Sequence, residues 1–162
     1  MRLHQATPSA DESSTPRATT SSTREVFFDT NVVLDVLLAR EPWREAAERL
    51  WRACDEGRAT GYLAATTLTN IFYVARKQKN ATEARAAIAL LLEAFDVVAV
   101  DRLVIAAALA LNGPDFEDDV QIACAQAVAA DVIVTRDPAG FARAAPTRVA
   151  GPAEWSSLEG LA

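Results

Sequence analysis

The sequence predicts an α/β fold in which helices cover a mainly parallel sheet. Three observations lead to this prediction. The chain has 162 residues, of which 51% are apolar, enough to bury one substantial core. Alanine occupies 34 positions and aromatic residues make up only 7%, a balance that suits helices packed closely on a small sheet better than an all-β barrel. Short β-rich runs alternate with longer helical patterns along the chain, as in folds with parallel strands.

Residues 1–24 are expected to form a disordered tail, and residues 25–162 the folded domain. The tail is dominated by Ser, Thr and Pro and has almost no large apolar side chain that could offset the entropy of ordering. Inside the domain, five short β-rich runs are the expected strands, of which the second is weak. These strands cover residues 26–28, 62–65, 97–100, 132–135 and 148–150.

Capping and terminating residues set the expected helix boundaries. The first helix stops before Pro42, and Gly57 terminates the second. The Asn80-x-x-Glu83 capping pattern opens the fourth helix, and a turn at residues 112–114 separates the fifth from the sixth. The expected helices cover residues 32–38, 43–56, 67–77, 82–95, 102–111 and, from 115 or 116, to 129, with a terminal turn over residues 152–158.

Charge and histidine content exclude several classes of function. Sixteen Lys and Arg against 22 Asp and Glu give a net charge of −6 and a pI near 4.8, which argues against a broad basic face for duplex DNA. The single histidine, His4, lies in the expected tail. The domain therefore lacks the residues for a Ser-His-Asp triad, a zinc-binding histidine cluster or histidine-based ribonuclease chemistry. Carboxylates must carry any acid–base or metal chemistry.

The remaining composition predicts a cytoplasmic protein without a membrane span. Cys54 and Cys124 form no CxxC motif, so we expect small buried hydrophobic residues in a reducing compartment rather than a disulfide. The N-terminal segment contains no apolar stretch typical of a secretory signal. The longest uninterrupted apolar run, residues 103–111, is far shorter than the roughly twenty residues that cross a bilayer.

Acidic residues follow two of the expected strands. Asp29 comes directly after the first strand and Asp137 closely follows the fourth, at the strand ends where open α/β sheets bind ligands. The acidic segment 115–119 opens the helix before the fourth strand, so its first turn is expected to face the same edge. Converging carboxylates are stable when protonated or bridged by a cation, and oxygen-only ligands suit Mg²⁺ or Mn²⁺. The pattern predicts a divalent-metal site.

Each acidic motif also has a purely structural interpretation. Asp115 can cap the N-terminus of its helix, where Asp118 is a favourable charge at the positive end of the helix dipole. Asp29 can form an Asx turn that caps the following helix, and Asp137 followed by proline is an ordinary start of a turn. The metal-site prediction therefore depends on the arrangement of all the motifs rather than on one of them.

Four segments carry a family resemblance: FDTNVVLD at residues 28–35, TLTNIFY at 67–73, DFED at 115–118 and VTRDP at 134–138. In this order they resemble the PIN domain over about residues 25–155. They are similar in particular to the small bacterial proteins of the VapC type, the ribonuclease toxins of toxin–antitoxin pairs. The resemblance implies a three-layer α/β/α fold with a mainly parallel central sheet.

The resemblance also implies a metal-dependent endoribonuclease that uses Mg²⁺ or Mn²⁺. Asp29, Asp118 and Asp137 would be its catalytic acids and metal ligands, and Thr135 a supporting hydroxyl group. Asn70 occupies the position where PIN nucleases usually carry glutamate. The implied partners are an RNA substrate, a small antitoxin protein and a second copy of the chain in a homodimer.

The asparagine matters because an amide oxygen can coordinate Mg²⁺ but brings no charge and cannot act as a base. Asn70 would then be a weak ligand, and Glu117 or Asp119 would supply the missing charge. A catalytically weak or inactive PIN-like module that binds RNA or protein is the alternative function. A phosphatase of the haloacid-dehalogenase type is disfavoured, because Asn31 stands where that chemistry needs a second aspartate.

Three further side-chain groups have two interpretations each. Trp43 and Tyr73 are expected in the core, with a dimer or partner interface as the alternative. Arg136 either contacts a substrate phosphate or is a solvated surface residue. The basic cluster Arg76, Lys77 and Lys79 either contacts RNA or marks the carboxyl end of a helix, where cations are favourable.

Overall fold

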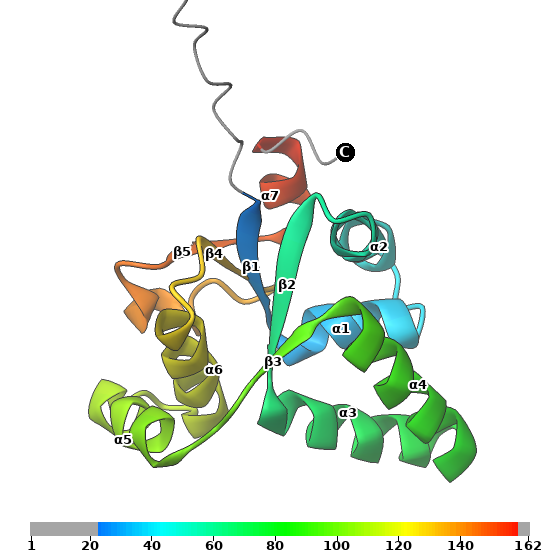
Figure 1. Cartoon of the computed structure of the whole chain (residues 1–162), viewed down its shortest axis with the longest axis horizontal. Coiled ribbons are helices and arrows are strands. Elements are labelled where there is room, and N and C mark those ends of the chain that lie inside the picture. Colours follow the sequence, from blue (N-terminus) through cyan, green and yellow to red (C-terminus); the bar gives the residue numbers. More distant parts are fainter. Residues whose placement is uncertain (1–22, 159–162) are drawn as a thin grey trace, which may run out of the picture.

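The computed structural model describes residues 23–158 and has the predicted three-layer α/β/α architecture (Figure 1). Its five-stranded sheet has the order β3-β2-β1-β4-β5, and every neighbouring pair of strands is parallel. The strands are β1 (Arg24–Phe28), β2 (Ala59–Ala64), β3 (Asp96–Val98), β4 (Val132–Val134) and β5 (Arg148–Ala150).

Helices cover both faces of the sheet. Helices α5 and α6 lie on one face, and α1, α2, α3, α4 and α7 lie on the other (Figure 1). Their bounds are α1 (Thr30–Leu37), α2 (Arg44–Asp55), α3 (Ala65–Gln78), α4 (Ala81–Ala94), α5 (Arg102–Leu111), α6 (Phe116–Ala127) and α7 (Pro152–Leu158), with a short 3₁₀ helix at Ala142–Ala144.

The central strand β1 positions the carboxyl edge of the sheet. Val26 and Phe28 point into the core shared with α1 and α2, whereas Phe27 points into the core shared with α6. Burial on both faces fixes the register of β1 between β2 and β4. The next residue, Asp29, is therefore held at the edge, where its N–H donates a 3.0 Å hydrogen bond to the carbonyl of Val134.

The structure corrects the expected elements at two places. Strand β2 begins at Ala59 rather than at residue 62, and its small residues hid it from the sequence pattern. Gly61 is needed there, because a Cβ atom would meet the Phe95 ring and lie 2.8 Å from Cys54 Sγ. The predicted terminal turn is the helix α7, which is fixed by the buried side chain of Trp155.

Two aromatic residues that were expected in the core lie at the surface. Trp43 is 45% exposed and Tyr73 is 67% exposed, so the core prediction is wrong for both. The helical pattern predicted where the helices lie along the chain. It did not predict which side of each helix is exposed to solvent. The core of this layer is built instead from aliphatic residues such as Leu50 and Ile71.

The structure bears on three further predictions from composition, which concern the cysteines, the apolar segments and the tail. Cys124 is buried, Cys54 is partly buried, and both thiols are free. No helix of the described part is long and apolar enough to cross a membrane. The expected tail lies outside the described residues except for Thr23 and Arg24, and Arg24 already belongs to β1. The tail therefore stays a prediction.

Candidate acidic active site

Asp29 is the most buried carboxylate of the candidate site, with an exposed fraction of 4%. It caps the N-terminus of α1, since its Oδ1 accepts a 3.3 Å hydrogen bond from the Asn31 N–H. Thr135 Oγ1 donates to its Oδ2 at 2.8 Å, and Gln121 Nε2 donates to its Oδ1 at 3.4 Å. The sequence predicted that Asp29 lies at the end of the first strand and can cap the following helix, and the structure confirms both.

Burial raises the pKa of Asp29, and repulsion from Glu117 adds to the rise. The hydrogen bonds from Thr135, Asn31 and Gln121 act in the opposite direction, because they stabilise the charged carboxylate. Neutral donors thus hold the Asp29 carboxylate in one orientation, and none of residues 23–158 pairs its charge with a cation.

Asp118 lies near Asp29 from a different element, the first turn of α6. Asp115 caps this helix and accepts hydrogen bonds from the backbone N–H groups of Glu117 at 2.8 Å and Asp118 at 3.5 Å. Burial raises the pKa of Asp118 to about 6, and repulsion from Asp115, Asp29, Glu117 and Asp137 adds to the rise. Five carboxylates therefore interact at this edge, whereas the motifs predicted three converging acids.

The carboxylates of Asp137 and Asp118 both lie next to Gly140. The Asp137 backbone N–H donates a 3.0 Å hydrogen bond to Thr135 Oγ1, and Asp137 Oδ1 accepts a 3.2 Å hydrogen bond from the Gly140 N–H. A Cβ atom on Gly140 would lie 2.9 Å from Asp137 Oδ2 and 3.1 Å from Asp118 Oδ2. The two carboxylates thus flank one glycine, and a side chain at this position would push them apart.

Asn70 and Glu117 meet at the rim of the same site. Asn70 Nδ2, from α3, donates a 2.8 Å hydrogen bond to Glu117 Oε1, from α6. Thr30 Oγ1 donates to the same oxygen at 3.4 Å. These residues line a pocket of about 360 Å³, here called the acidic pocket, together with Asp29, Asn31, Tyr73, Val74, Asp115, Asp118 and Gln121.

Of the two residues expected to compensate for Asn70, the structure places Glu117 in the acidic pocket and Asp119 elsewhere. Asp119 is buried, and it accepts hydrogen bonds from Arg143 Nη2 at 2.9 Å and from the Gly113 N–H at 2.7 Å. Successive residues of a helix point about 100° apart, so positions 117 and 119 face different sides. Asp119 is a structural ion-pair partner of Arg143, and its expected role as compensating charge is wrong.

Sequence patterns did not identify Gln121 as a site residue. It is buried on the inner face of α6, where its Oε1 accepts a 3.2 Å hydrogen bond from the Thr30 N–H while its Nε2 donates to Asp29. Its spacing of three residues after Asp118 was an available signal, because residues i and i+3 share one face of a helix. A polar residue in an otherwise apolar helix face needs a partner, and here the partner is the site itself.

One interpretation of Arg136 was a solvated surface residue, and the structure does not support it. Its guanidinium carbon lies 4.2 Å from the centre of the Trp43 ring, and its Nη1 lies 3.3 Å from Oδ1 of the buried Asp35. The side chain therefore points toward α1 and away from the acidic pocket, which it does not line. Arg76 and Lys77 lie in the last turn of α3, as the helix-end interpretation expects.

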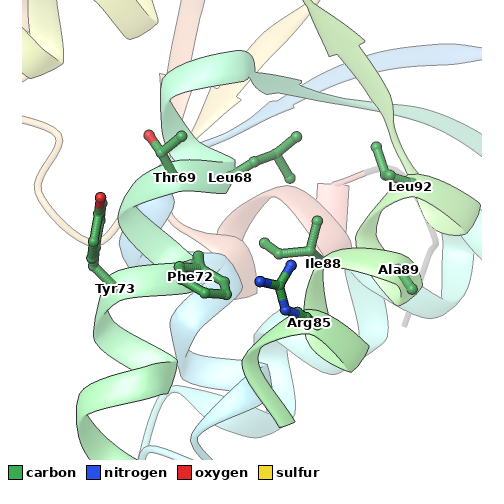
Figure 2. A pocket seen from close by; sticks show the side chains of 8 residues that line it. All are labelled: Leu68, Thr69, Phe72, Tyr73, Arg85, Ile88, Ala89 and Leu92. Carbon is green, nitrogen blue, oxygen red and sulfur yellow. The ribbon is translucent and has the colours of Figure 1, made fainter. Parts of the chain in front are cut away.

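A second, apolar groove adjoins the site between α3 and α4 (Figure 2). Its volume is about 580 Å³, and Leu68, Phe72, Ile88 and Leu92 point into the space between the two helices. Arg85 extends over the Phe72 ring at 5.7 Å. Tyr73 lines both this groove and the acidic pocket, so the two hollows share one wall.

The donor set of the acidic pocket suits Mg²⁺ or Mn²⁺ in chemistry, because all its ligand atoms are oxygens and its carboxylates repel one another. Among residues 23–158, however, no three Asp, Glu, His or Cys side chains stand ready to hold an ion together. The structure thus brings Asp29, Asp118 and Asp137 to one edge without closing them into a coordination shell.

Comparison with protein families gives a match between the PIN domain model and residues 25–139. The chain belongs to the PIN domain family. The matched region runs from β1 through α6 and β4 and includes the four motifs that carried the resemblance. No relative was found among curated proteins.

Solved structures with this fold include VapC20, VapBC and FitAcB. DNA-bound VapBC from Salmonella typhimurium has a TM-score of 0.63 at 16% identity, over 80% of this chain and 99% of that chain. FitAcB from Neisseria gonorrhoeae has a TM-score of 0.61 at 20% identity, over 78% and 97%. VapC20 from Mycobacterium tuberculosis, a toxin that cleaves the sarcin–ricin loop, has a TM-score of 0.56 at 16% identity, over 67% and 86%. At these identities the likeness concerns the fold.

Proposed function

We propose that this PIN domain is a metal-dependent endoribonuclease and the toxin of a toxin–antitoxin pair. The observation that carries the proposal is the convergence of Asp29, Asp118 and Glu117 on the acidic pocket, with Asp137 beside Asp118. Burial and repulsion from the neighbouring carboxylates raise the pKa of Asp118, and a bound cation would relieve that repulsion. The fold shared with VapC20, a toxin that cleaves RNA at the sarcin–ricin loop, supports this reading.

Asp29, Asp118 and Asp137 would hold Mg²⁺ or Mn²⁺. When bound, such an ion lowers the pKa of a coordinated water and neutralises charge on the scissile phosphate. The protein contributes the orientation of the ligands. Thr135 donates its hydroxyl hydrogen to Asp29 and accepts the Asp137 N–H, so one side chain sets the spacing between two of the three aspartates.

Glu117 would supply the carboxylate that position 70 lacks. The Asn70 amide donates to Glu117 Oε1, which leaves Oε2 free to accept a proton from a water molecule. In this arrangement Asn70 orients the carboxylate and is not itself the base. The negative charge that other PIN nucleases place on the helix after the second strand thus comes from α6 in this protein.

The test is cleavage of an end-labelled structured RNA by the full chain over a Mn²⁺ series, with EDTA as the metal-free arm. We expect cleavage only with metal, and a loss of about 100-fold in Asp29→Asn and in Asp118→Asn. Glu93→Gln is the matched control, because it removes an exposed carboxylate of α4 outside the acidic pocket. Full activity of both aspartate variants would contradict the proposal.

A PIN-like module that binds RNA or protein without turnover is the second candidate. Two points favour it: the PIN resemblance implies a glutamate at the position that Asn70 occupies, and no three ligand side chains of the described residues are placed ready for an ion. The same assay separates the two functions. RNA and Mn²⁺ binding without cleavage, in the wild type and in Asn70→Glu at every Mn²⁺ concentration, would establish the binding module.

A small antitoxin is the proposed protein partner. The groove between α3 and α4 offers apolar anchors, and the acidic pocket beyond Tyr73 is complementary to basic side chains. A segment that carries apolar residues followed by a lysine or arginine would match both hollows at once. The structures of VapBC and FitAcB, which contain the same fold, and the resemblance to VapC-type toxins support this choice of partner.

A homodimer is the proposed oligomeric state, and the cytoplasm the proposed location, where an RNA substrate is available. Helix α5 leaves Leu103 and Leu109 largely exposed, although its sequence is almost entirely apolar. Exposed apolar surface of this kind is typical of interfaces. Light scattering of the wild type and of Leu109→Glu measures the mass: a dimer that the substitution dissociates is expected, and a monomeric wild type contradicts it.

A further inference from the structure

We infer that Asp35, Arg136 and Trp43 form an anchor that positions the segment 135–137, and with it the acidic site. The inference rests on the proposed function, since it assigns these residues a role in holding the groups that would bind the metal. None of the three lines the acidic pocket. Each is therefore a positioning residue, and none is catalytic.

The first step concerns the burial of the ion pair. Asp35 is fully buried on α1, and Arg136 Nη1 lies 3.3 Å from its Oδ1. Neither carboxylate oxygen of Asp35 has a hydrogen bond within the described residues. Taking the Asp35 charge out of water costs several kcal/mol, and its partner Arg136 is only 24% exposed. Apolar side chains of similar size often replace such a pair without loss of stability. Stability alone is therefore a poor explanation for this pair.

The second step concerns what Arg136 connects. Its side chain is fixed on two sides, by the ion pair with Asp35 and by the Trp43 ring, whose centre is 4.2 Å from the guanidinium carbon. Its backbone lies between Thr135 and Asp137. Thr135 Oγ1 donates to Asp29 at 2.8 Å and accepts the Asp137 N–H at 3.0 Å. A rotation of the backbone at position 136 would disturb both hydrogen bonds.

The third step concerns helix α1, which links the two ends of the chain of contacts between Asp29 and Asp35. Asp29 caps the N-terminus of α1, and Asp35 lies further along the same helix. From Asp29 the contacts run through Thr135 to the backbone of Arg136, from its side chain to Asp35, and back along α1. Because both Asp29 and Asp35 are attached to α1, the ion pair fixes the position of segment 135–137, which follows β4, relative to Asp29. The cluster thus determines where Asp137 lies relative to Asp29.

The chain contains a matched control for this cluster. Arg148 lies over the Trp155 ring at 5.2 Å and pairs with Glu154 at 3.4 Å. This second arginine–tryptophan–carboxylate group joins Arg148 of β5 to residues of α7, and Glu154 also lines the hollow beside Trp43 and Arg136. Its ion pair is exposed rather than buried, and Glu154 does not line the acidic pocket, so Glu154→Gln removes an arginine–carboxylate contact near the anchor and leaves the Asp35–Arg136 pair in place.

The experiment compares Asp35→Asn, the double variant Asp35→Leu/Arg136→Met, and Glu154→Gln with the wild type. Three quantities are measured: Mn²⁺ affinity by calorimetry, hydrogen exchange of the Asp137 amide by NMR, and kcat and KM for RNA cleavage. In the first two variants we expect Mn²⁺ affinity and kcat to fall about 10- to 100-fold, KM to stay unchanged, and the Asp137 amide to exchange faster. Glu154→Gln should behave as the wild type.

The double variant separates positioning from folding, because two apolar side chains can fill the space of the pair and keep the melting temperature. Wild-type Mn²⁺ affinity and amide exchange in a stable double variant would overturn the inference. A raised KM with unchanged Mn²⁺ affinity would also overturn it, since Arg136 would then contact RNA directly. If the wild type neither binds Mn²⁺ nor cleaves RNA, the proposed function fails, and the amide exchange still decides whether the anchor holds segment 135–137.

Discussion

Asn70 Nδ2 donates a 2.8 Å hydrogen bond to Glu117 Oε1, so an amide of α3 holds a carboxylate of α6 at the rim of the acidic pocket. This contact changes how the asparagine in the usual glutamate position is understood. A carboxylate from another helix lies next to the position where the PIN resemblance leads us to expect a glutamate. The pair therefore gives direct predictions about which of the two residues carries function.

We expect Glu117→Gln to weaken Mn²⁺ binding and RNA cleavage more than Asn70→Ala, because only the first removes a charge. Asn70→Ala should change cleavage by less than about tenfold, or about 1.4 kcal/mol. Asn70→Glu should tighten Mn²⁺ binding and raise cleavage, since a cation can bridge the two facing carboxylates. Calorimetry and a cleavage series over Mn²⁺ measure these effects. Equal cleavage by the wild type and Asn70→Glu at every metal concentration would place position 70 outside the site.

Asp118→Asn is expected to raise the melting temperature of the metal-free protein by a few degrees at pH 8. The folded protein raises the pKa of Asp118 to about 6 from an ordinary value near 3.8, so the folded state binds this proton more tightly than the unfolded state. The resulting stabilisation is present at low pH and is lost as pH rises through about 6. The advantage of the variant should therefore shrink toward pH 4. Thermal unfolding in EDTA over this pH range tests the sign.

At pH 8, added Mn²⁺ should make the wild type more stable than Asp118→Asn. An ion that binds the folded state stabilises it by mass action, and the wild type has the carboxylate that Asp118→Asn lacks. A variant that is less stable than the wild type in EDTA at pH 8 would show that the charge of Asp118 is already balanced within the protein.

Thr135→Val should lower both stability and activity. It leaves Asp29 Oδ2 without its 2.8 Å donor and the Asp137 N–H without its acceptor, a loss of about 1–3 kcal/mol in the free energy of unfolding. Urea unfolding and Mn²⁺ titration measure the two effects. Thr66→Val is the matched control, because Thr66 Oγ1 is buried without a hydrogen-bond partner. Similar losses in both variants would remove the special role of Thr135.

Gly140→Ala should impair the site while leaving the fold intact. The added Cβ would lie 2.9 Å from Asp137 Oδ2 and 3.1 Å from Asp118 Oδ2, so the carboxylates must move apart. We expect Mn²⁺ affinity to fall about tenfold with little change in melting temperature. Gly151→Ala is the control, because nothing lies within 4 Å of a Cβ at that position. Unchanged Mn²⁺ binding in Gly140→Ala would separate Asp118 from Asp137 in function.

The sequence predicted those parts of the molecule that follow from local patterns. Parallel strands that each end in an acidic residue placed Asp29 and Asp137 at one edge, and the capping pattern at Asn80 is confirmed by its 2.9 Å hydrogen bond from the Glu83 N–H. Strand β2 was only partly predicted. Its first residues, including Gly61, have low β propensity and are held in the sheet by their pairing with β1.

Contacts between distant elements could not be predicted in the same way. The residues adjacent to Asp119 in the sequence do not indicate its ion pair with Arg143. The residues adjacent to Arg136 likewise do not indicate its ion pair with Asp35. The exposed side of α3, with Tyr73 on it, depends on how closely α4 packs, which hydrophobic spacing alone does not determine. Pairings of this kind are set by the three-dimensional arrangement, and a single sequence carries no direct signal of them.

The wall that Tyr73 forms between the apolar groove and the acidic pocket has a kinetic consequence. A protein bound along the groove would obstruct the approach of a long polymer to the pocket even if it touched no carboxylate. Inhibition of that kind would not be relieved by raising the Mn²⁺ concentration, whereas an inhibitor that competes with the ion would be displaced.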